Sequence, residues 1–111
     1  MKPLSAADLR HRITISASVE TDNGRGGSAT AWTPIAKPWA EVLGLDGRES
    51  VMNKVLQGVS VYRIRIRYRA DIEPKQQIRF GSATLNIKSV SDPFGTRREL
   101  VIMADTESTL G

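Results

Sequence analysis

Cysteine and histidine, which often carry catalysis or bind metals in proteins, are almost missing from this sequence. Cysteine is absent, and His11 is the single histidine. Without cysteine there can be no disulfide, no thiolate metal site and no cysteine nucleophile. One imidazole is too few for most metal sites and leaves a catalytic triad hard to assemble. We therefore interpret His11 as an ordinary surface or half-buried group.

Two further arrangements that support catalysis are missing. The 12 aspartate and glutamate residues are scattered, and no motif places two carboxylates at a defined spacing for acid–base chemistry. The glycines of Asn23–Gly27 lack both the strand-to-helix context and the lysine of a phosphate-binding loop. The sequence therefore predicts no catalytic residue, no metal site and no cofactor. This argues against an enzyme, whether a minor hydrolase or an enzyme accessory protein.

An arginine-rich stretch is the most informative chemical feature. Val59–Arg69 has the sequence VSVYRIRIRYR, in which arginine alternates with apolar or aromatic residues. Because successive side chains of a strand point to opposite faces, this stretch predicts a strand with one basic face. The basic face carries Arg63, Arg65, Arg67 and Arg69, and the opposite face carries Tyr62, Ile64, Ile66 and Tyr68.

The basic face has two interpretations. In the first, which we favour, its charges pair with carboxylates such as Glu41 or Glu99 on adjacent strands. In the second, the four arginines contact another subunit or DNA phosphates. A subunit ranks ahead of DNA because no aromatic residue shares the arginine face to stack on bases. Trp32 and Trp39 are interpreted as core or interface anchors.

Charge and hydropathy limit the location and the partners. Lysine and arginine total 16 against 12 acidic residues, which gives a net charge of +4. This modest surplus favours contact with polyanions but is also common among soluble proteins. The first residues lack the apolar run of a signal peptide, and no stretch is long enough to span a bilayer. We expect neither secretion nor a membrane partner.

Alternation of apolar and polar residues predicts a mainly β protein. The chain suits one domain, 1–111, of which 1–8 are expected to be a flexible tail. Pro34 makes the second predicted strand an edge strand, because proline removes a ladder donor. We predict a small antiparallel β-barrel, which removes exposed edges, with one short inserted helix and long polar loops. The predicted strands are His11–Ser18, Ala31–Ile35, Trp39–Leu43, Val59–Arg69, Gln77–Phe80, Ala83–Val90 and Arg98–Ala104.

The inserted helix is predicted over Asp46–Leu56. Asp46 and Glu49 have the spacing of a capping box at its start. Gly44 and Gly58 bracket the segment as helix breakers. An apolar stripe follows the cap at helical spacing and consists of Val51, Met52, Val55 and Leu56.

A second interruption of the strand pattern, Glu20–Thr30, is polar and rich in glycine. It has almost nothing to bury, so it predicts either a mobile hairpin loop or a tip that only a partner orders. The candidate docking loop consists of Asn23, Gly24, Arg25, Gly26 and Gly27.

The order of several short segments resembles the head–tail joining family of tailed bacteriophages, also called head-closure or head–tail adaptor proteins. The resemblance extends from about Leu9 to Thr106. Each segment alone is weak, but their order and spacing together are fairly specific. The segments are Leu9–Ile15, Trp39–Val42, Gly47–Glu49, Tyr62–Arg69, Ile87–Val90, Asp92–Pro93 and Arg97–Leu100.

The resemblance implies a structural protein of the phage neck, without catalysis or cofactor. Such a protein docks as a ring below the portal or adaptor ring, closes the DNA channel after packaging and provides the tail-attachment surface. Its implied partners are the portal or adaptor ring, tail proteins and further copies of itself, with possible non-specific contact to packaged DNA. It would reside in the virion, and in the host cytoplasm during assembly. The alternative is a small β-barrel that binds nucleic acid, suggested by the net charge and the arginine strand.

In such a ring, we expect the Gly44–Gly58 segment to face the channel. It interrupts two strong strands, so it must project from one barrel end, and its glycines can act as hinges. A helix of about three turns is marginal without packing, so it could refold between states. The alternative is that the helix only caps the open barrel end with its apolar stripe. The candidate channel-facing residues are Arg48, Val51, Met52, Lys54 and Val55, with Arg48 and Lys54 as phosphate contacts.

Overall fold

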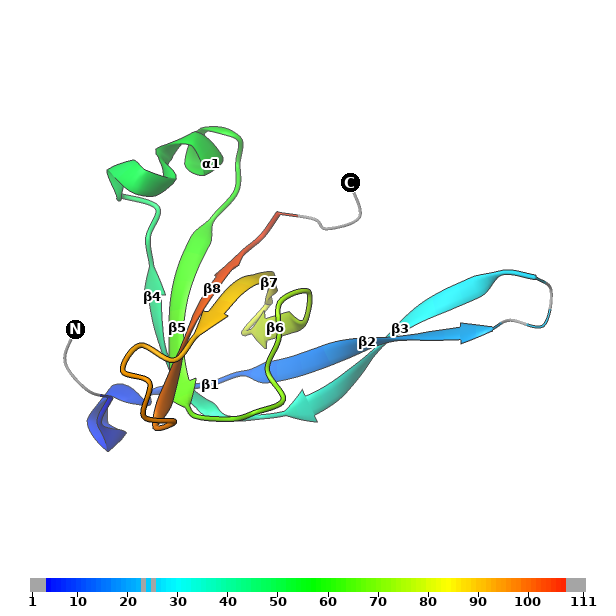
Figure 1. Ribbon diagram of the computed structural model, residues 1–111. Helices are drawn as coiled ribbons and strands as arrows, with labels where there is room; N and C mark the ends of the chain where they lie inside the picture. Colours follow the sequence, from blue (N-terminus) through cyan, green and yellow to red (C-terminus); the bar gives the residue numbers. More distant parts are fainter. Residues whose placement is uncertain (1–3, 23, 25, 108–111) are drawn as a thin grey trace.

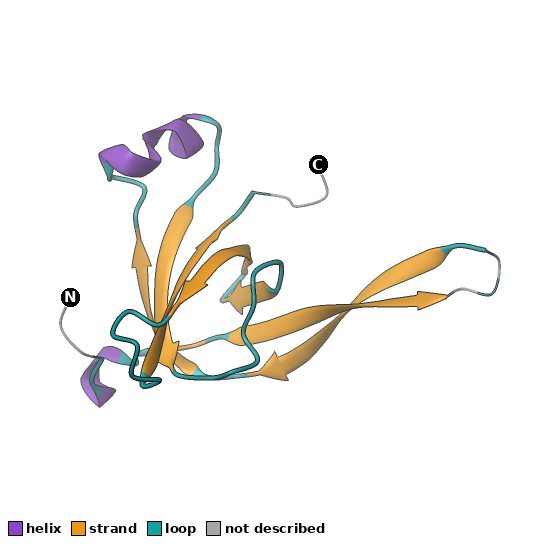
Figure 2. Ribbon diagram, in the orientation of Figure 1, coloured by secondary structure: helices purple, strands orange, loops and turns teal. Residues whose placement is uncertain are grey.

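The computed structural model describes residues 4–22, 24 and 26–107. In this part of the chain, eight antiparallel strands form one sheet that is curled into a half-barrel (Figure 1). The predicted mainly β fold with one short α-helix is therefore confirmed (Figure 2). The strands are β1 (His11–Arg12), β2 (Thr14–Asp22), β3 (Ser28–Ala36), β4 (Trp39–Gly44), β5 (Val61–Arg67), β6 (Gln77–Phe80), β7 (Ala83–Ser91) and β8 (Glu99–Asp105), in the spatial order β1-β4-β5-β8-β7-β6-β2-β3.

One extended segment joins the two ends of the central run of strands. On one side, β1 pairs with β4, with His11 opposite Ala40. On the other side, β2 pairs with β6, with Ile15 opposite Ile78. Only Ile13 separates β1 from β2, and its amide donates to the carbonyl of Pro38 over 3.1 Å. Residues 11–16 thus reach both β4 and β6 and cover part of the open edge of each strand.

The core is built from the inward positions that alternation predicts. In β5, Ile64 and Ile66 are fully buried, and Tyr62 packs against the edge of the core. Burial of one such aliphatic side chain stabilises the fold by about 1.5–3 kcal/mol. The fully buried aliphatic side chains are Ile13, Ile15, Ile64, Ile66, Ile78, Leu85, Ile87 and Ile102.

A long hairpin of β2 and β3 extends away from the half-barrel (Figure 1). Beyond Ser16, β2 pairs with β3 alone, and we call residues 17–22 and 28–33 the arm. The prediction of a loop over Glu20–Thr30 is wrong at both ends, because Glu20 pairs with Thr30 in a ladder that continues to Asp22 and Ser28. As predicted, β3 is an edge strand that contains Pro34.

The tip of the arm contains the candidate docking loop. Gly24 and Gly26 both have positive φ angles, which residues with side chains adopt rarely. Asn23 and Arg25 lie outside the described residues. Docking through this loop stays a prediction.

The inserted helical segment is shorter than predicted. It consists of a 3-10 turn, η2 (Glu49–Val51), followed by α1 (Met52–Leu56). The predicted capping box is wrong: Arg48 occupies the cap position, and the Asp46 carboxylate instead accepts a hydrogen bond from the amide of Val61 over 2.9 Å. This amide belongs to the first residue of β5, so the carboxylate binds the strand and does not cap the helical segment. No helix in the described ranges is long and apolar enough to cross a membrane.

The N-terminal residues that the structure describes make defined contacts. Residues Ala6–Asp8 form a 3-10 turn, η1, and the amide and hydroxyl of Ser5 both donate to the Asp8 carboxylate over 3.0 Å. The amide of Leu4 donates to Glu99 in β8 over 2.7 Å. The predicted flexibility of residues 1–8 stays a prediction, and residues 1–3 lie outside the described part.

Candidate subunit-contact and channel-contact surfaces

Arg65, in the middle of the arginine strand, is buried with only 3% of its surface exposed. Its guanidinium donates to Glu99 of β8 over 3.0 Å and to Glu41 of β4 over 3.3 Å. Glu41 lies directly opposite Arg65 in the ladder, and Glu99 is as deeply buried as the arginine. For Arg65, pairing with these two carboxylates on adjacent strands is the arrangement that the first interpretation predicts.

The remaining three arginines have different environments. Arg69 lies beyond the end of β5 and forms two hydrogen bonds with Asp71, which lower the pKa of that carboxyl. Arg63 is half-buried, and its Nε is buried without a hydrogen-bond partner in the described structure. Arg67 is exposed. Neither Arg63 nor Arg67 has an ion pair within the described ranges, so these two stay candidates for a subunit or DNA contact.

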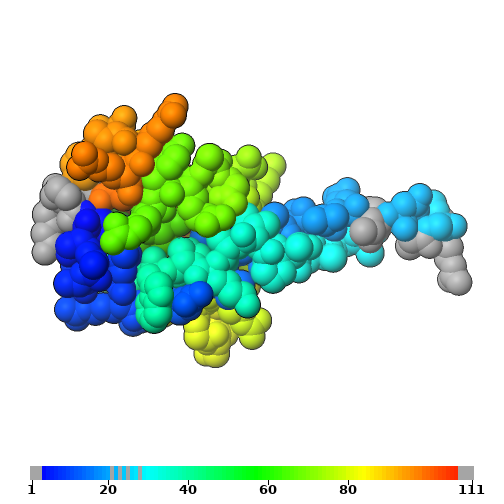
Figure 3. All heavy atoms as spheres, turned by 90° about the horizontal axis from the view of Figure 1, so that it is seen from below, coloured from blue at the N-terminus to red at the C-terminus, as the bar shows by residue number. Residues whose placement is uncertain are grey.

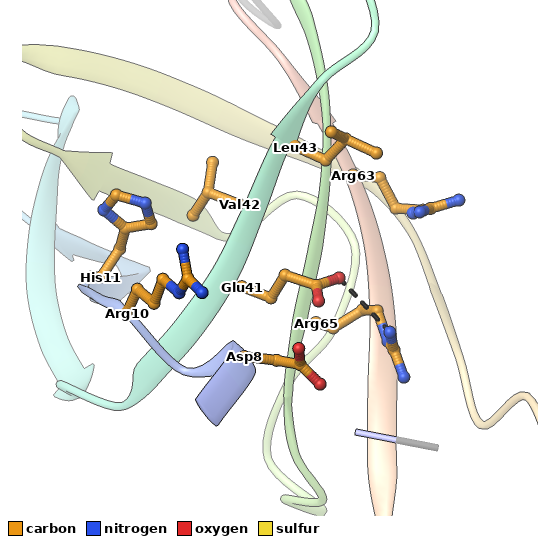
Figure 4. A pocket seen from close by; sticks show the side chains of 8 residues that line it. All are labelled: Asp8, Arg10, His11, Glu41, Val42, Leu43, Arg63 and Arg65. Atoms are coloured by element: carbon orange, nitrogen blue, oxygen red, sulfur yellow. Dashed lines mark hydrogen bonds and ion pairs between the residues drawn. The ribbon is translucent and has the colours of Figure 1, made fainter. Parts of the chain in front are cut away.

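A pocket of about 650 Å³ lies beside the arginine strand. Figure 4 shows Asp8 and Glu41 between Arg10 on one side and Arg65 on the other, so its charges are mixed. His11, at its edge, packs edge-to-face on Phe80 with ring centroids 5.1 Å apart. Charges of both signs make this pocket a poor receptor for a polyanion. Its lining residues are Asp8, Arg10, His11, Glu41, Val42, Leu43, Arg63 and Arg65.

A second pocket lies at the end of the half-barrel that carries the β7–β8 turn. It has a volume of about 460 Å³. Its exposed charges are both positive, because Glu99 is buried against Arg65. Phe94 is 45% exposed. We call it the Phe94 pocket, and it is lined by Leu4, Arg67, Phe94, Thr96, Arg98 and Glu99.

The Gly44–Gly58 segment stands at another end of the half-barrel, where Figure 2 shows its helical turns above β4 and β5. None of the residues in η2 or α1 is buried. Val51 and Val55 are half-buried, whereas Met52 is exposed and Leu56 is 77% exposed. Arg48 is exposed as well. The apolar stripe is thus divided between the barrel end and solvent.

Lys54 connects this segment to the end of β8 through two ion pairs. Its ammonium donates to Glu107 over 2.7 Å and to the buried Asp105 over 3.0 Å. These hydrogen bonds raise the pKa of Lys54 and lower that of Glu107. Lys88 lies 3.8 Å from the other oxygen of Asp105. The predicted phosphate contact of Lys54 would require the lysine to leave both carboxylates.

The Lys54 ion-pair cluster has a predictable pH dependence. Because the folded-state pKa of Glu107 is lowered, its stabilising effect is present above the unfolded pKa and is lost as the pH falls through the folded value. Because the pKa of Lys54 is raised, its contribution is present below the unfolded pKa and is lost as the pH rises through the folded value. The cluster is therefore intact at neutral pH and weakens in acid.

We expect the Glu107 carboxyl carbon, followed by NMR, to titrate below the usual range of glutamate. In Lys54→Met its midpoint should rise most of the way back, because the largest cause of the shift is removed. Lys37→Met, which removes an exposed lysine elsewhere, serves as the control. An unchanged midpoint in Lys54→Met would show that the ion pair is absent in solution.

Several aromatic residues are exposed, and the sequence predicted no role for one of them, Phe94. Trp32 and Trp39 are 38% and 51% exposed, so the interpretation of these residues as core anchors is wrong. A role as interface anchors stays a prediction. Trp39 packs under the guanidinium of Arg12, with 5.4 Å to the ring centroid. Phe94 could have been found from its sequence, because an aromatic residue between proline and glycine in a turn has no strand face on which to be buried.

No group of three or more metal-ligating side chains occurs in the ranges that the structure describes.

Two solved structures resemble this chain in fold. The solution structure of protein SF1141 from Shigella flexneri 2a matches with a TM-score of 0.72 and 26% identity, covering 96% of this chain and 99% of that one. A chain from the virion of a native gene transfer agent particle matches with a TM-score of 0.65 and 21% identity, covering 90% and 96%, which shows a shared fold. No curated protein matches.

A family model described as phage head completion protein matches residues 4–107, nearly the whole chain. The members of that family are structural virion proteins that associate with other neck and tail proteins. The chain therefore belongs to the phage head completion protein family and is a non-enzymatic structural protein of the virion at the junction of head and tail.

Proposed function

We propose that this protein docks as a ring below the portal or adaptor ring once the genome is packaged. The ring closes the DNA channel and presents the surface to which the tail attaches. The observation that carries the proposal is the Gly44–Gly58 segment, which projects from one end of the half-barrel with no buried residue of its own. Before docking, the free chain is present in the host cytoplasm.

Closure would come from repetition of this segment around the ring. Each copy places one segment near the axis, so that many weak contacts act together. The exposed side chains of Met52 and Leu56 would pack between copies, and Arg48 would contact phosphates. The half-buried Val51 and Val55 fit the capping alternative in the free chain. The two roles are compatible if Lys54 releases its carboxylates when the ring docks.

The test uses packaged heads that lack a closure protein. Purified chain is added, and the DNA that stays protected from nuclease is measured while negative-stain images of the neck are recorded. We expect the chain to restore genome retention and to add a ring below the portal. Leakage of DNA in the presence of folded chain would contradict the proposal.

The free chain is expected to be a monomer or only weakly associated. The large apolar side chains that are exposed lie apart, on the arm, at the start of β4, on α1 and in the β7–β8 turn. Such scattered side chains do not form the continuous patch that obligate association needs. Sedimentation velocity at micromolar concentration measures this. A stable closed ring without any partner would contradict it and would show that docking does not template the ring.

A nucleic-acid-binding barrel is the second candidate. Arg63 and Arg67 favour it, because neither has an ion pair in the described ranges and the chain carries a net charge of +4. A direct DNA binder loses affinity along a straight line of log affinity against log salt concentration, with a slope set by the phosphates contacted. Affinity that is absent at low salt would exclude this candidate.

A further inference from the structure

In the part of the chain that the structure describes, the arm has no third strand beside it. Beyond Ser16, its two strands pair only with each other. Isolated two-stranded hairpins are marginally stable in water, and sheet edges without a partner invite pairing with another chain. The side chains of Val19 and Trp32 are exposed on it. An arm of this kind is explained if another molecule covers it after assembly.

The two faces of the arm differ in chemistry. Directly opposed residues of an antiparallel pair share a face, so Ser18 lies beside Trp32 and Glu20 beside Thr30. Asp22 follows on the same side by alternation. We call Ser18, Glu20, Asp22, Thr30 and Trp32 the acidic face. Neither carboxylate on it has an ion pair in the described part of the chain. The opposite face carries small and β-branched residues, namely Ala17, Val19, Ala29, Ala31 and Thr33.

The Phe94 pocket is complementary to the acidic face. It presents the exposed arginines Arg67 and Arg98, neither of which has an ion pair within the described ranges. Its partly exposed phenyl ring offers an aromatic surface to Trp32. Two carboxylates with one indole on the arm thus match two guanidinium groups with one phenyl ring in the pocket.

The arm and the pocket lie at opposite ends of the molecule. Both the ribbon in Figure 1 and the space-filling view in Figure 3 place the arm at one end and the turn that contains Phe94 at the other. The longest dimension of the molecule is 51 Å. Two complementary surfaces on opposite ends cannot meet within one copy. They can join copies head to tail, which is the kind of interface that closes a ring.

We propose that the acidic face of the arm of one copy docks in the Phe94 pocket of the next copy. Glu20 and Asp22 pair with Arg67 and Arg98, and Trp32 packs against Phe94. This inference rests on the proposed ring, because it names the contact between neighbouring copies. The contact also gives the arm a role, because the buried core cluster contains none of the arm residues.

The sequence contains no cysteine, so introduced thiols are the only groups that a thiol-specific cross-linker can join. Thr30→Cys places a thiol on the acidic face, and Thr96→Cys places one in the pocket. Necks assembled from the double variant on packaged heads are treated with a short bismaleimide. We expect a ladder of dimers, trimers and larger species. The control pairs Ala31→Cys, on the opposite face of the arm, with Thr96→Cys and should give a severalfold weaker ladder.

The outcomes separate the contact from the function. Genome retention without a ladder, or with equal ladders from both cysteine pairs, would overturn the arm contact and leave channel closure standing. Loss of retention with wild-type chain would overturn the proposed function instead. Where the double variant fails to dock, it is cross-linked free in solution at its highest soluble concentration, at which weak association is populated. In that case a ladder supports the contact, and its absence overturns the contact.

Exchanging the charges gives an independent measurement. Glu20→Arg and Arg98→Glu, each introduced into the cysteine pair, should lower the ladder severalfold because like charges then meet. Combining them in one chain should restore most of it. Arg98 is chosen because Arg67 lies opposite Glu99 in the β5–β8 ladder, where another carboxylate would destabilise the sheet. Both positions are exposed, and circular dichroism verifies folding. Additive losses in the combined variant would overturn the proposed pairing.

Discussion

Replacing Arg65 with methionine should lower the free energy of unfolding by about 3–5 kcal/mol, the range seen when one partner of a buried ion pair is removed. The loss comes from Glu99, which is 3% exposed and would be left buried without the guanidinium 3.0 Å away. Methionine has a similar length and little polarity, so a cavity contributes little. Urea unfolding with a constant m value measures the change.

Two variants control this expectation. Arg67→Met changes the next arginine on the same face of β5, where the side chain is exposed, and should alter stability by less than about 0.5 kcal/mol. Arg65→Met combined with Glu99→Leu removes both buried charges and should recover most of the loss. Recovery stays incomplete because the amide of Leu4 loses its acceptor. Equal effects of Arg65→Met and Arg67→Met would show that the buried pair is not formed.

The strands and the core were predictable because both depend on local alternation. The β5 pattern alone placed Ile64 and Ile66 inside and the arginines outside, and the predicted Gln77–Phe80 coincides with β6. Pro34 was sufficient to place β3 at an edge. Alternation of apolar and polar residues is a property of each strand by itself, so it does not depend on which strands pair.

Features that depend on distant partners were not predictable in the same way. Asp46 has capping-box spacing, but it bonds to the amide of Val61, 15 residues away. The sequence does not predict the hairpin ladder because its residues are mostly polar and show no apolar alternation, although their backbones pair from Glu20 to Asp22. Alternation placed Arg65 among the outward-facing residues. In the structure Arg65 is buried together with Glu99 of the neighbouring strand β8.

Removing the Gly44–Gly58 segment should separate folding from function. We expect replacement of Gly47–Gln57 by a short Gly-Ser linker to leave the half-barrel folded, because no residue of η2 or α1 is buried. Asp46 is kept since its carboxylate holds the first amide of β5. Circular dichroism and urea unfolding measure the fold. The exposed stripe and Lys54 are lost with the segment.

In contrast, the same variant should fail to keep DNA in packaged heads, and protected DNA should fall to the level of heads without any closure protein. The matched control is Met52→Ser with Leu56→Ser, which keeps the length and the Lys54 ion-pair cluster but removes the exposed apolar side chains. If copies pack through these side chains, the control should give intermediate retention. If the linker variant retains the genome as well as wild type does, the segment only caps the half-barrel, and the channel must be closed by another part of the ring.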